Sequence, residues 1–295
     1  MKKQLTGVMP PVPTLFSNDR LTLDRFQANL DRLLGTGLAG FVVLGSNGEA
    51  NLLSDKEKLE LLRCARKQIP SSKWLLAGTG LESTRATCEL TKKAADCGTD
   101  IALVLTPSFY RPNRDGLRKH FEIVAESSPI PVMLYNVPKF TNMNISTDLV
   151  AELAKHPNIV GIKDSAGDIG QLAELREKTP KNFAIFIGAD KAFFAGLLHG
   201  IMDGAILALS NVAPNECVAV FEAVEKGDVL SAQALFARLA PVGRTVVGKY
   251  GVPGLKAALE LVGAHGGELR LPLLPLEQPA RDEIATVLRT AELIS

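Results

Sequence analysis

The chain has 295 residues, of which 46% are hydrophobic and 22% are charged, and its formal net charge is +1. This length and composition suit one large domain with a substantial core. The near-neutral charge, without basic or acidic blocks, argues against nucleic acid or an anionic membrane as the main partner, and the apolar runs are too short for a membrane-spanning helix.

The first twelve residues, MKKQLTGVMPPV, place two lysines before a segment that is not continuously apolar. A secretory signal requires an apolar region behind its basic start. We therefore expect no secretory signal here and predict a cytoplasmic protein.

Eight short apolar segments follow one another along the chain, and each predicts a strand. They are residues 7–14, 40–46, 74–80, 101–107, 131–138, 159–165, 183–190 and 204–210. Most are apolar at consecutive positions, which is typical of parallel strands covered on both faces. The first, GVMPPVPT, is the weakest prediction because three prolines interrupt it.

Helical patterns lie between these strands. SDKEKLELLRCARKQI, residues 54–69, opens with Ser54 and Glu57 at the spacing of a capping box. Alternating strands and helices predict a closed (β/α)8 TIM barrel, with an open doubly wound sheet as the structural alternative. After Ser210 only helices are predicted, so we assign residues 1–225 to the barrel and 226–295 to an all-helical C-terminal extension packed on it.

Neither a dinucleotide site nor a metal site is predicted when the relevant residues are considered in their sequence context. GTGLAG, residues 35–40, matches a dinucleotide-binding pattern by letter, but a predicted helix precedes it and a strand follows, the reverse of the required order. The four cysteines and four histidines are scattered without metal-ligand spacing. We expect reduced, mostly structural cysteines and no protein-bound catalytic metal.

In a TIM barrel the catalytic groups lie at the carboxyl ends of the strands. Lys163 ends the apolar segment IVGIK, and Tyr135 lies on the preceding strand. A lysine at a strand end often just reaches water, and a tyrosine is often a core aromatic. If both side chains point inward, however, a desolvated amine there is a nucleophile for a ketone, and the phenol beside it transfers protons. The turn GSNGE, residues 45–49, supplies groups that suit a carboxylate.

The motifs GSNGEANLL, LYNVP and GIKDSAGD resemble those of the dihydrodipicolinate synthase/N-acetylneuraminate lyase superfamily of pyruvate-dependent class I aldolases. The resemblance covers almost the whole chain. It implies a Schiff-base lysine, a proton-transferring tyrosine, a carboxylate-binding pair, and lining residues on strands seven and eight. On this sequence these fall, respectively, on Lys163, on Tyr135, on Ser46 and Asn47, and on Gly188 and Ile206. Ser165, which follows Lys163 at the end of strand six, is a further candidate lining residue from its position alone. The resemblance also implies that no metal or organic cofactor is needed and that the chain forms a homotetramer, built as a dimer of dimers.

Two departures from the family pattern bear on the substrate. Dihydrodipicolinate synthases carry an arginine that binds the carboxylate of aspartate semialdehyde, whereas this chain has Phe140 there, beside Lys139. The family often places a tyrosine from a neighbouring subunit in the proton relay. Here that position falls on Phe109, with Tyr110 next to it as the alternative.

Further segments, LLAGTGLESTRAT and GVPGLKAALELVGAHGG, resemble 4-hydroxy-2-oxoglutarate aldolases. The leading prediction is therefore a lyase that cleaves 4-hydroxy-2-oxoglutarate to pyruvate and glyoxylate. The alternatives are a 2-keto-3-deoxy-sugar-acid aldolase, a dihydrodipicolinate synthase of lysine biosynthesis, and a non-catalytic barrel that binds a small 2-oxo acid.

Overall fold

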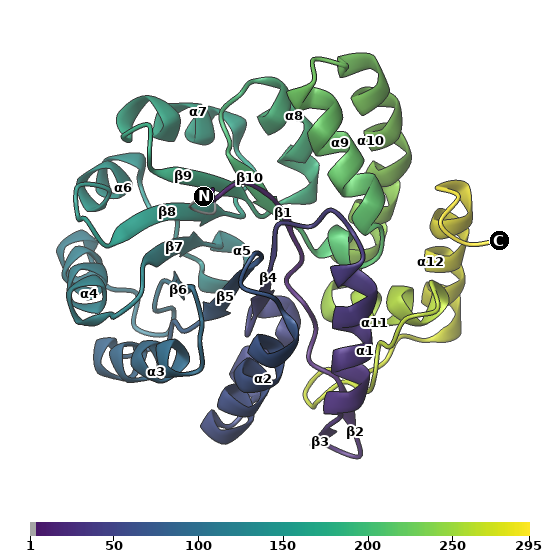
Figure 1. Ribbon diagram of the computed structural model, residues 1–295, viewed down its shortest axis with the longest axis horizontal. Helices are drawn as coiled ribbons and strands as arrows, with labels where there is room; N and C mark the ends of the chain where they lie inside the picture. Colours follow the sequence, from purple (N-terminus) through teal and green to yellow (C-terminus); the bar gives the residue numbers. More distant parts are fainter. Residues whose placement is uncertain (1–3) are drawn as a thin grey trace.

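A computed structural model describes residues 4–295; Lys2 and Lys3, on which part of the signal prediction depends, lie outside them. Eight parallel strands form one sheet that curves into a barrel (Figure 1). They are β1 (Gly7–Met9), β4 (Gly40–Val43), β5 (Trp74–Gly78), β6 (Ile101–Leu105), β7 (Val132–Asn136), β8 (Ile159–Asp164), β9 (Ala184–Ile187) and β10 (Gly204–Ile206). Each predicted strand is present, and β2 (Phe16–Ser17) and β3 (Arg20–Leu21) add a small antiparallel hairpin. The prediction of a (β/α)8 TIM barrel is confirmed.

The barrel closes between β1 and β4, where prolines limit the regular pairing. β1 pairs with β10 over three residues and ends at Met9. Beyond it, the amide of Val42 donates to the carbonyl of Pro10, and the amide of Val12 donates to the carbonyl of Val42, both at 2.9 Å. Proline lacks an N–H donor, so the hydrogen bonds at this seam use the carbonyl of Pro10 and the amides of the valines.

The helices surround the strands, as Figure 1 shows. Those of the barrel are α1 (Leu23–Leu34), α2 (Asp55–Gln68), α3 (Thr84–Asp96), α4 (Arg114–Ser127), α5 (Pro138–Thr141), α6 (Thr147–Leu153), α7 (Ile169–Lys178), α8 (Phe193–Leu198) and α9 (Pro214–Glu225). The capping box predicted for α2 is present, because the Glu57 amide donates to Ser54 Oγ and the Ser54 amide donates to Glu57 Oε2.

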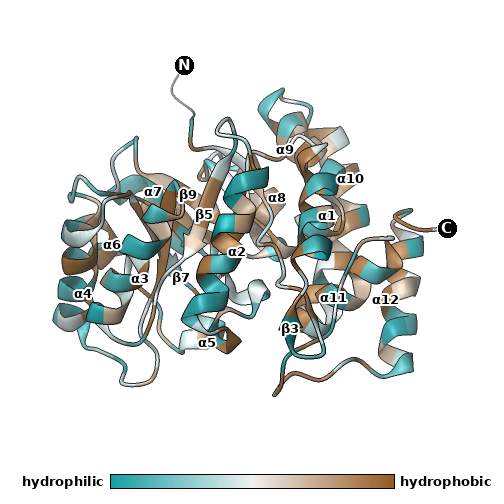
Figure 2. Ribbon diagram, turned by 60° about the horizontal axis from the view of Figure 1, so that its bottom comes forward, coloured by the Kyte–Doolittle hydropathy of each residue, from teal (hydrophilic) through white to brown (hydrophobic). Residues whose placement is uncertain are grey.

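Two apolar layers hold these elements together. Met9, Leu103, Met133, Phe186 and Ile206 fill the barrel interior, and a larger layer packs between strands and helices. Figure 2 shows the same division, with β5 mainly in hydrophobic colours and hydrophilic bands along the outer helices such as α2 and α12. The glycines of GTGLAG serve the fold as predicted: Gly35 ends α1, and a side chain at Gly40, which begins β4, would meet the Trp74 carbonyl oxygen at 2.5 Å.

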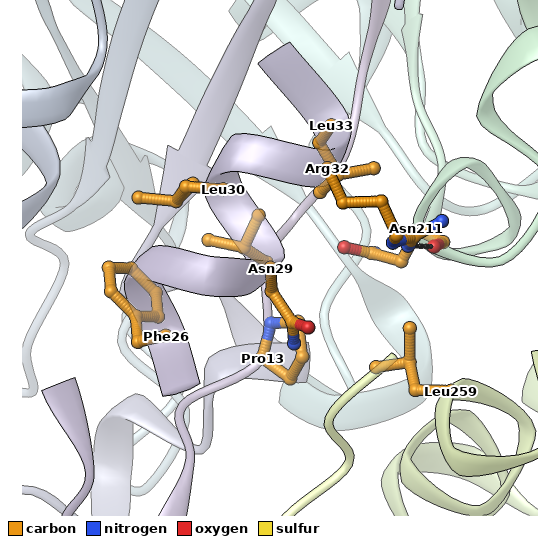
Figure 3. Close-up of a pocket in the computed structure, with 9 residues that line it drawn as sticks. Pro13, Phe26, Asn29, Leu30, Arg32, Leu33, Asn211 and Leu259 are labelled. Atoms are coloured by element: carbon orange, nitrogen blue, oxygen red, sulfur yellow. Dashed lines mark hydrogen bonds between the residues drawn. The ribbon is translucent and has the colours of Figure 1, made fainter. Parts of the chain in front are cut away.

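The C-terminal extension comprises α10 (Val229–Gly243), a π-helical segment (Arg244–Lys249), α11 (Gly251–Leu261) and α12 (Gln278–Thr290). Figure 3 shows one place where it meets the barrel, with Leu259 of α11 facing α1 and Arg32 donating to the carbonyl of Asn211. The cavity there measures about 10 Å³, close to the volume that one water requires, so it is a packing defect and not a ligand site. The division at residues 225 and 226 stays a prediction.

None of the helices in residues 4–295 combines the length and the apolar character that crossing a membrane demands. Over the same residues all four cysteines are free, and three of them, Cys64, Cys97 and Cys217, are buried.

Candidate active site

Lys163 and Tyr135 lie side by side at the carboxyl end of the barrel. They are register partners on the neighbouring strands β8 and β7. The Lys163 ammonium nitrogen lies 4.3 Å from the centre of the Tyr135 ring, and only 3% of Lys163 is exposed. Tyr135 packs with the residues of the barrel interior. The condition set by the sequence, that both side chains point inward, is therefore met.

The Tyr135 hydroxyl connects the lysine to the turn that follows β4. Its oxygen lies 3.3 Å from Ser46 Oγ, a hydrogen bond in which either group can donate. Burial alone would raise the pKa of Tyr135. The positive charge of Lys163, the hydrogen bond with Ser46 and the polar groups of Ser165 and Lys163 close to the hydroxyl outweigh burial, so the pKa of this phenol is lowered. A phenol with a lowered pKa, in contact with an amine and a hydroxyl, is suited to proton transfer.

Ser46 and Asn47 belong to a tight 3-10 turn, η1 (Ser46–Gly48). The Gly48 amide donates to the Gly45 carbonyl at 2.9 Å, and Thr14 Oγ1 donates to the Gly48 carbonyl at 2.6 Å. These bonds fix the turn from the segment after β1 as well as from within. Ser46 lines the cavity together with Tyr135, and Asn47 is half-buried beside it.

Ser165, Gly188 and Ile206 close the site from the other side. A side chain at Gly188 would lie 2.1 Å from Ser165 Oγ and 2.7 Å from Lys163 Cε, so only glycine leaves room for both. The Gly188 amide donates to the Asp164 carbonyl at 2.7 Å. Ile206 is buried in the barrel interior near Tyr135. The structure thus brings Tyr135, Ser165 and Gly188 close to Lys163, and Ser46 close to Tyr135. Asn47 follows Ser46 in η1, and Ile206 packs in the same interior layer as Tyr135.

Tyr110 is the exception. Tyr110 and Phe109 are 87% and 78% exposed, and their rings contact each other edge to face at 5.0 Å. Within one chain neither ring reaches Tyr135 or Ser46 by a described contact. Their exposure is compatible with a role toward a second subunit, and which of them fills the relay position stays a prediction.

Two acidic residues near the lysine were given no role in the site from the sequence. Asp164, adjacent to Lys163, accepts hydrogen bonds from Asn136 at 2.7 Å, Gln171 at 3.0 Å and the Ala166 amide at 3.0 Å. Burial raises the pKa of Asp164 despite these bonds. The carboxylate holds the DSAG turn that carries Ser165, and its place directly after the lysine was the available signal.

Asp190 is the second missed residue and lies two positions after Gly188. Burial raises its pKa to about 6, although the Leu209 amide and the charge of Lys163 both oppose this shift. Its Oδ1 has no hydrogen-bond partner among residues 4–295. An unpartnered buried oxygen beside an active-site lysine is typical of a functional site. The sequence GAD at the end of a predicted strand was the signal for it.

A cavity of about 380 Å³ with largely apolar walls lies beside the site, and Ser46 and Tyr135 are the predicted site residues that line it. Leu44, Leu81, Leu105, Val137, Phe140, Val252 and Leu273 form most of these walls. Phe140 is 58% exposed, and the Lys139 ammonium lies 5.9 Å from the centre of its ring. In the described part of the chain no group of three His, Cys, Asp or Glu residues is arranged to hold a metal ion.

The chain is similar to a well-populated family over nearly its whole length. The model of the dihydrodipicolinate synthetase family matches residues 4–291. A 4-hydroxy-tetrahydrodipicolinate synthase from Methanoculleus marisnigri is 38% identical over 285 residues, covering 96% of this chain and 98% of the relative. One of the same name from Stenotrophomonas maltophilia is 38% identical and covers 99% of both chains.

Among solved structures, a prophage protein of the dihydrodipicolinic acid synthase family from E. coli K12, in complex with pyruvate, superposes with a TM-score of 0.93. It is 32% identical, and the match covers 98% of this chain and 99% of that one.

Proposed function

The chain belongs to the dihydrodipicolinate synthetase family, and we propose that Lys163 is the residue on which it forms a Schiff base with pyruvate. As a member it is a pyruvate-dependent carbon–carbon lyase that uses a lysine Schiff base and no metal or other cofactor. The observation that carries the proposal is the contact between the buried Lys163 amine and the Tyr135 ring, whose hydroxyl is hydrogen-bonded to Ser46.

In this mechanism the neutral Lys163 amine adds to the C2 carbonyl of a 4-hydroxy-2-oxo acid, and loss of water gives an iminium ion. The turn at Ser46 and Asn47 holds the C1 carboxylate. Tyr135, relayed through Ser46, takes the proton of the C4 hydroxyl. The C3–C4 bond breaks, its electron pair moves into the enamine, and the aldehyde leaves. Protonation at C3 and hydrolysis release pyruvate and the free amine, and condensation is the same path in reverse.

The first candidate for the aldehyde partner is aspartate semialdehyde, in the reaction of a 4-hydroxy-tetrahydrodipicolinate synthase. The names of the relatives support this reaction better than the cleavage of 4-hydroxy-2-oxoglutarate that the sequence favoured.

Phe140 favours a second candidate, an aldolase that acts on another 4-hydroxy-2-oxo acid. It lies in the cavity wall. By the resemblance described above, this is the position at which dihydrodipicolinate synthases carry an arginine. A phenyl ring offers no donor to a substrate carboxylate, whereas a guanidinium group binds one with two hydrogen bonds. The 4-hydroxy-2-oxoglutarate and 2-keto-3-deoxy-sugar-acid interpretations therefore remain in this second candidate.

Borohydride reduction in the presence of pyruvate, followed by peptide mass mapping, tests the proposal. We expect a reduced pyruvate adduct on Lys163; its absence would favour a non-catalytic barrel. Turnover with aspartate semialdehyde, 4-hydroxy-2-oxoglutarate and 2-keto-3-deoxy-sugar acids then separates the candidates. If the synthase reaction is the native one, Phe140→Arg should raise activity with aspartate semialdehyde only modestly, whereas a new activity would support the second candidate.

We include in the proposal a cytoplasmic homotetramer. Light scattering of the purified protein tests the assembly, and a dimer or monomer would contradict it.

A further inference from the structure

A buried ion pair joins the substrate turn to the C-terminal extension. Glu49 follows η1, and Lys256 lies on α11. Glu49 Oε1 is 2.5 Å from Lys256 Nζ, and the two side chains are 0% and 3% exposed. Removing one member of such a pair leaves the other charge buried without its partner. This pair is outside the group of residues to which the mechanism assigns a role.

On the side of the turn, Glu49 sets the backbone on which Ser46 and Asn47 lie. Its φ angle is +52°, in the left-handed region that residues other than glycine seldom adopt. The Glu49 amide donates to the Ser46 carbonyl at 3.2 Å, and its own carbonyl accepts from the Leu52 amide at 2.8 Å. A strained conformation persists only where its surroundings hold it. The side-chain contacts of Glu49 are therefore part of what holds the turn in shape.

On the side of the extension, both partners of Glu49 are themselves fixed. Lys256 Nζ donates to the Glu268 carbonyl at 2.7 Å and lies 4.9 Å from the centre of the Phe16 ring. The second oxygen of Glu49, Oε2, accepts from the Arg270 amide at 3.2 Å.

The Arg270 guanidinium group covers the same Phe16 ring at 4.2 Å and donates to the Leu52 carbonyl and to Glu57. The segment after α11 thus holds Glu49 itself, through the Arg270 amide, and the residues that follow it. Burial lowers the pKa of Lys256, and Glu49 opposes that shift. Without the carboxylate the ammonium would lose its nearest counter-charge.

We propose that Glu49 is a positioning residue through which the C-terminal extension sets the geometry of Ser46 and Asn47, and with it the affinity of the site for the carboxylate of the 2-oxo acid. This inference rests on the proposed function, because it assumes that the turn binds that carboxylate. It gives the extension a part in catalysis although none of its groups is assigned to the reaction.

The test compares Glu49→Gln, Lys256→Met and the double variant. The readouts are the pyruvate concentration that half-saturates borohydride trapping on Lys163 and the turnover at saturating substrate. We expect each single variant to raise the half-saturating concentration by tenfold or more and to lower saturated turnover by less than threefold. Because the two groups act as one pair, the double variant should be no worse than the poorer single variant.

Lys256→Met keeps an unbranched chain beside Phe16, and Lys256→Arg keeps the charge as well. If Glu49→Gln does not fold, these two variants decide the matter. We expect Lys256→Arg to stay within threefold of the wild type in half-saturation, and Lys256→Met to differ tenfold.

Asp203→Asn is the matched control, because it breaks a half-buried ion pair with Arg176 at the opposite end of the barrel. It should lower stability and leave half-saturation unchanged. The inference is overturned if Glu49→Gln and Lys256→Met behave like this control, losing stability with unaltered half-saturation. Absence of trapping on Lys163 in the wild type would instead contradict the proposed function itself.

Discussion

At the amino ends of the strands, Asp100 and Asp203 each accept a backbone hydrogen bond and pair with an arginine. At the carboxyl ends, Asp190 accepts from the Leu209 amide, but its Oδ1 has no hydrogen-bond partner among the described residues. Asp100 Oδ2 accepts from the Leu75 amide at 2.7 Å, and Asp203 Oδ2 accepts from the Ile185 amide at 2.8 Å.

Asp100 and Asp203 each precede a strand and bind the start of the neighbouring strand, so the same arrangement occurs at two places in the barrel. At the carboxyl ends, Lys163 is buried within reach of the charge of Asp190, and among the described residues Asp190 forms no ion pair with an arginine. The difference follows the division of labour in TIM barrels, where one face carries stability and the other carries catalysis. The three residues are all aspartates, so their roles differ not by residue type but by whether neighbouring groups supply hydrogen bonds and a counter-charge to the carboxylate.

Lys163→Met is expected to have the largest effect, because it removes the reactive group at the carboxyl ends of the strands. Loss of the nucleophile should lower turnover by roughly 10⁴-fold or more. The free energy of unfolding should stay the same or rise, because methionine fills the space of a buried cation with an apolar chain. A pyruvate-release assay and urea unfolding measure the two effects. Turnover above one hundredth of the wild type would show that another group forms the Schiff base.

Tyr135→Phe, at the same end of the barrel, separates the formation of the Schiff base from the breaking of the C–C bond. We expect kcat to fall by roughly 10² to 10³-fold, because the general acid–base group is lost while the lysine remains. Borohydride should still trap pyruvate on Lys163. If trapping disappears with turnover, Tyr135 acts in forming the Schiff base as well as in breaking the C–C bond.

The fold and the lysine could be predicted from the sequence for physical reasons that the structure makes plain. Parallel strands covered on both faces are continuously apolar, so IVGIK and IALVL are recognisable without tertiary information. A charged residue at the end of such a run, as at Lys163, then indicates a special environment. The side to which Tyr135 and Lys163 point could not be derived, because the pairing of β7 with β8 shifts register between Val132 and Met133.

The remaining site residues depend on contacts between distant segments. Glu49 and Lys256 meet only because α11 packs near η1, and no local pattern in either segment predicts their ion pair. Asp190 was within reach of the sequence, but an aspartate after a strand is common in turns, and its burial comes from the surrounding elements. Local patterns therefore predict elements, whereas burial and pairing of charges require the fold.

Asp190→Asn tests the pH dependence that the carboxyl end should show. The pKa of Asp190 is about 6 in the folded protein against an ordinary value of 3.8. Between these values the folded state binds more protons than the unfolded state, so this residue's contribution to stability falls as the pH rises. The wild type should lose about 3 kcal/mol relative to Asp190→Asn between pH 3.5 and pH 7. Urea unfolding of both proteins at the two pH values measures it, and equal pH slopes would contradict the prediction.

Asp203→Asn tests the amino ends of the strands, and it is the variant for which we expect the smallest effect. Asparagine keeps an acceptor for the Ile185 amide but loses the charge that pairs with Arg176. The pair is half-buried, so solvent screens part of its interaction, and the free energy of unfolding should fall by about 1 to 2 kcal/mol. Turnover and the half-saturating pyruvate concentration should stay within twofold, because the residue precedes β10 and the site lies at the strand's other end. Urea unfolding and steady-state kinetics on one preparation provide the check. A substantial loss of turnover in a folded Asp203→Asn protein would mean that the amino end also shapes the site, and that stability and catalysis are not divided between the two ends of this barrel.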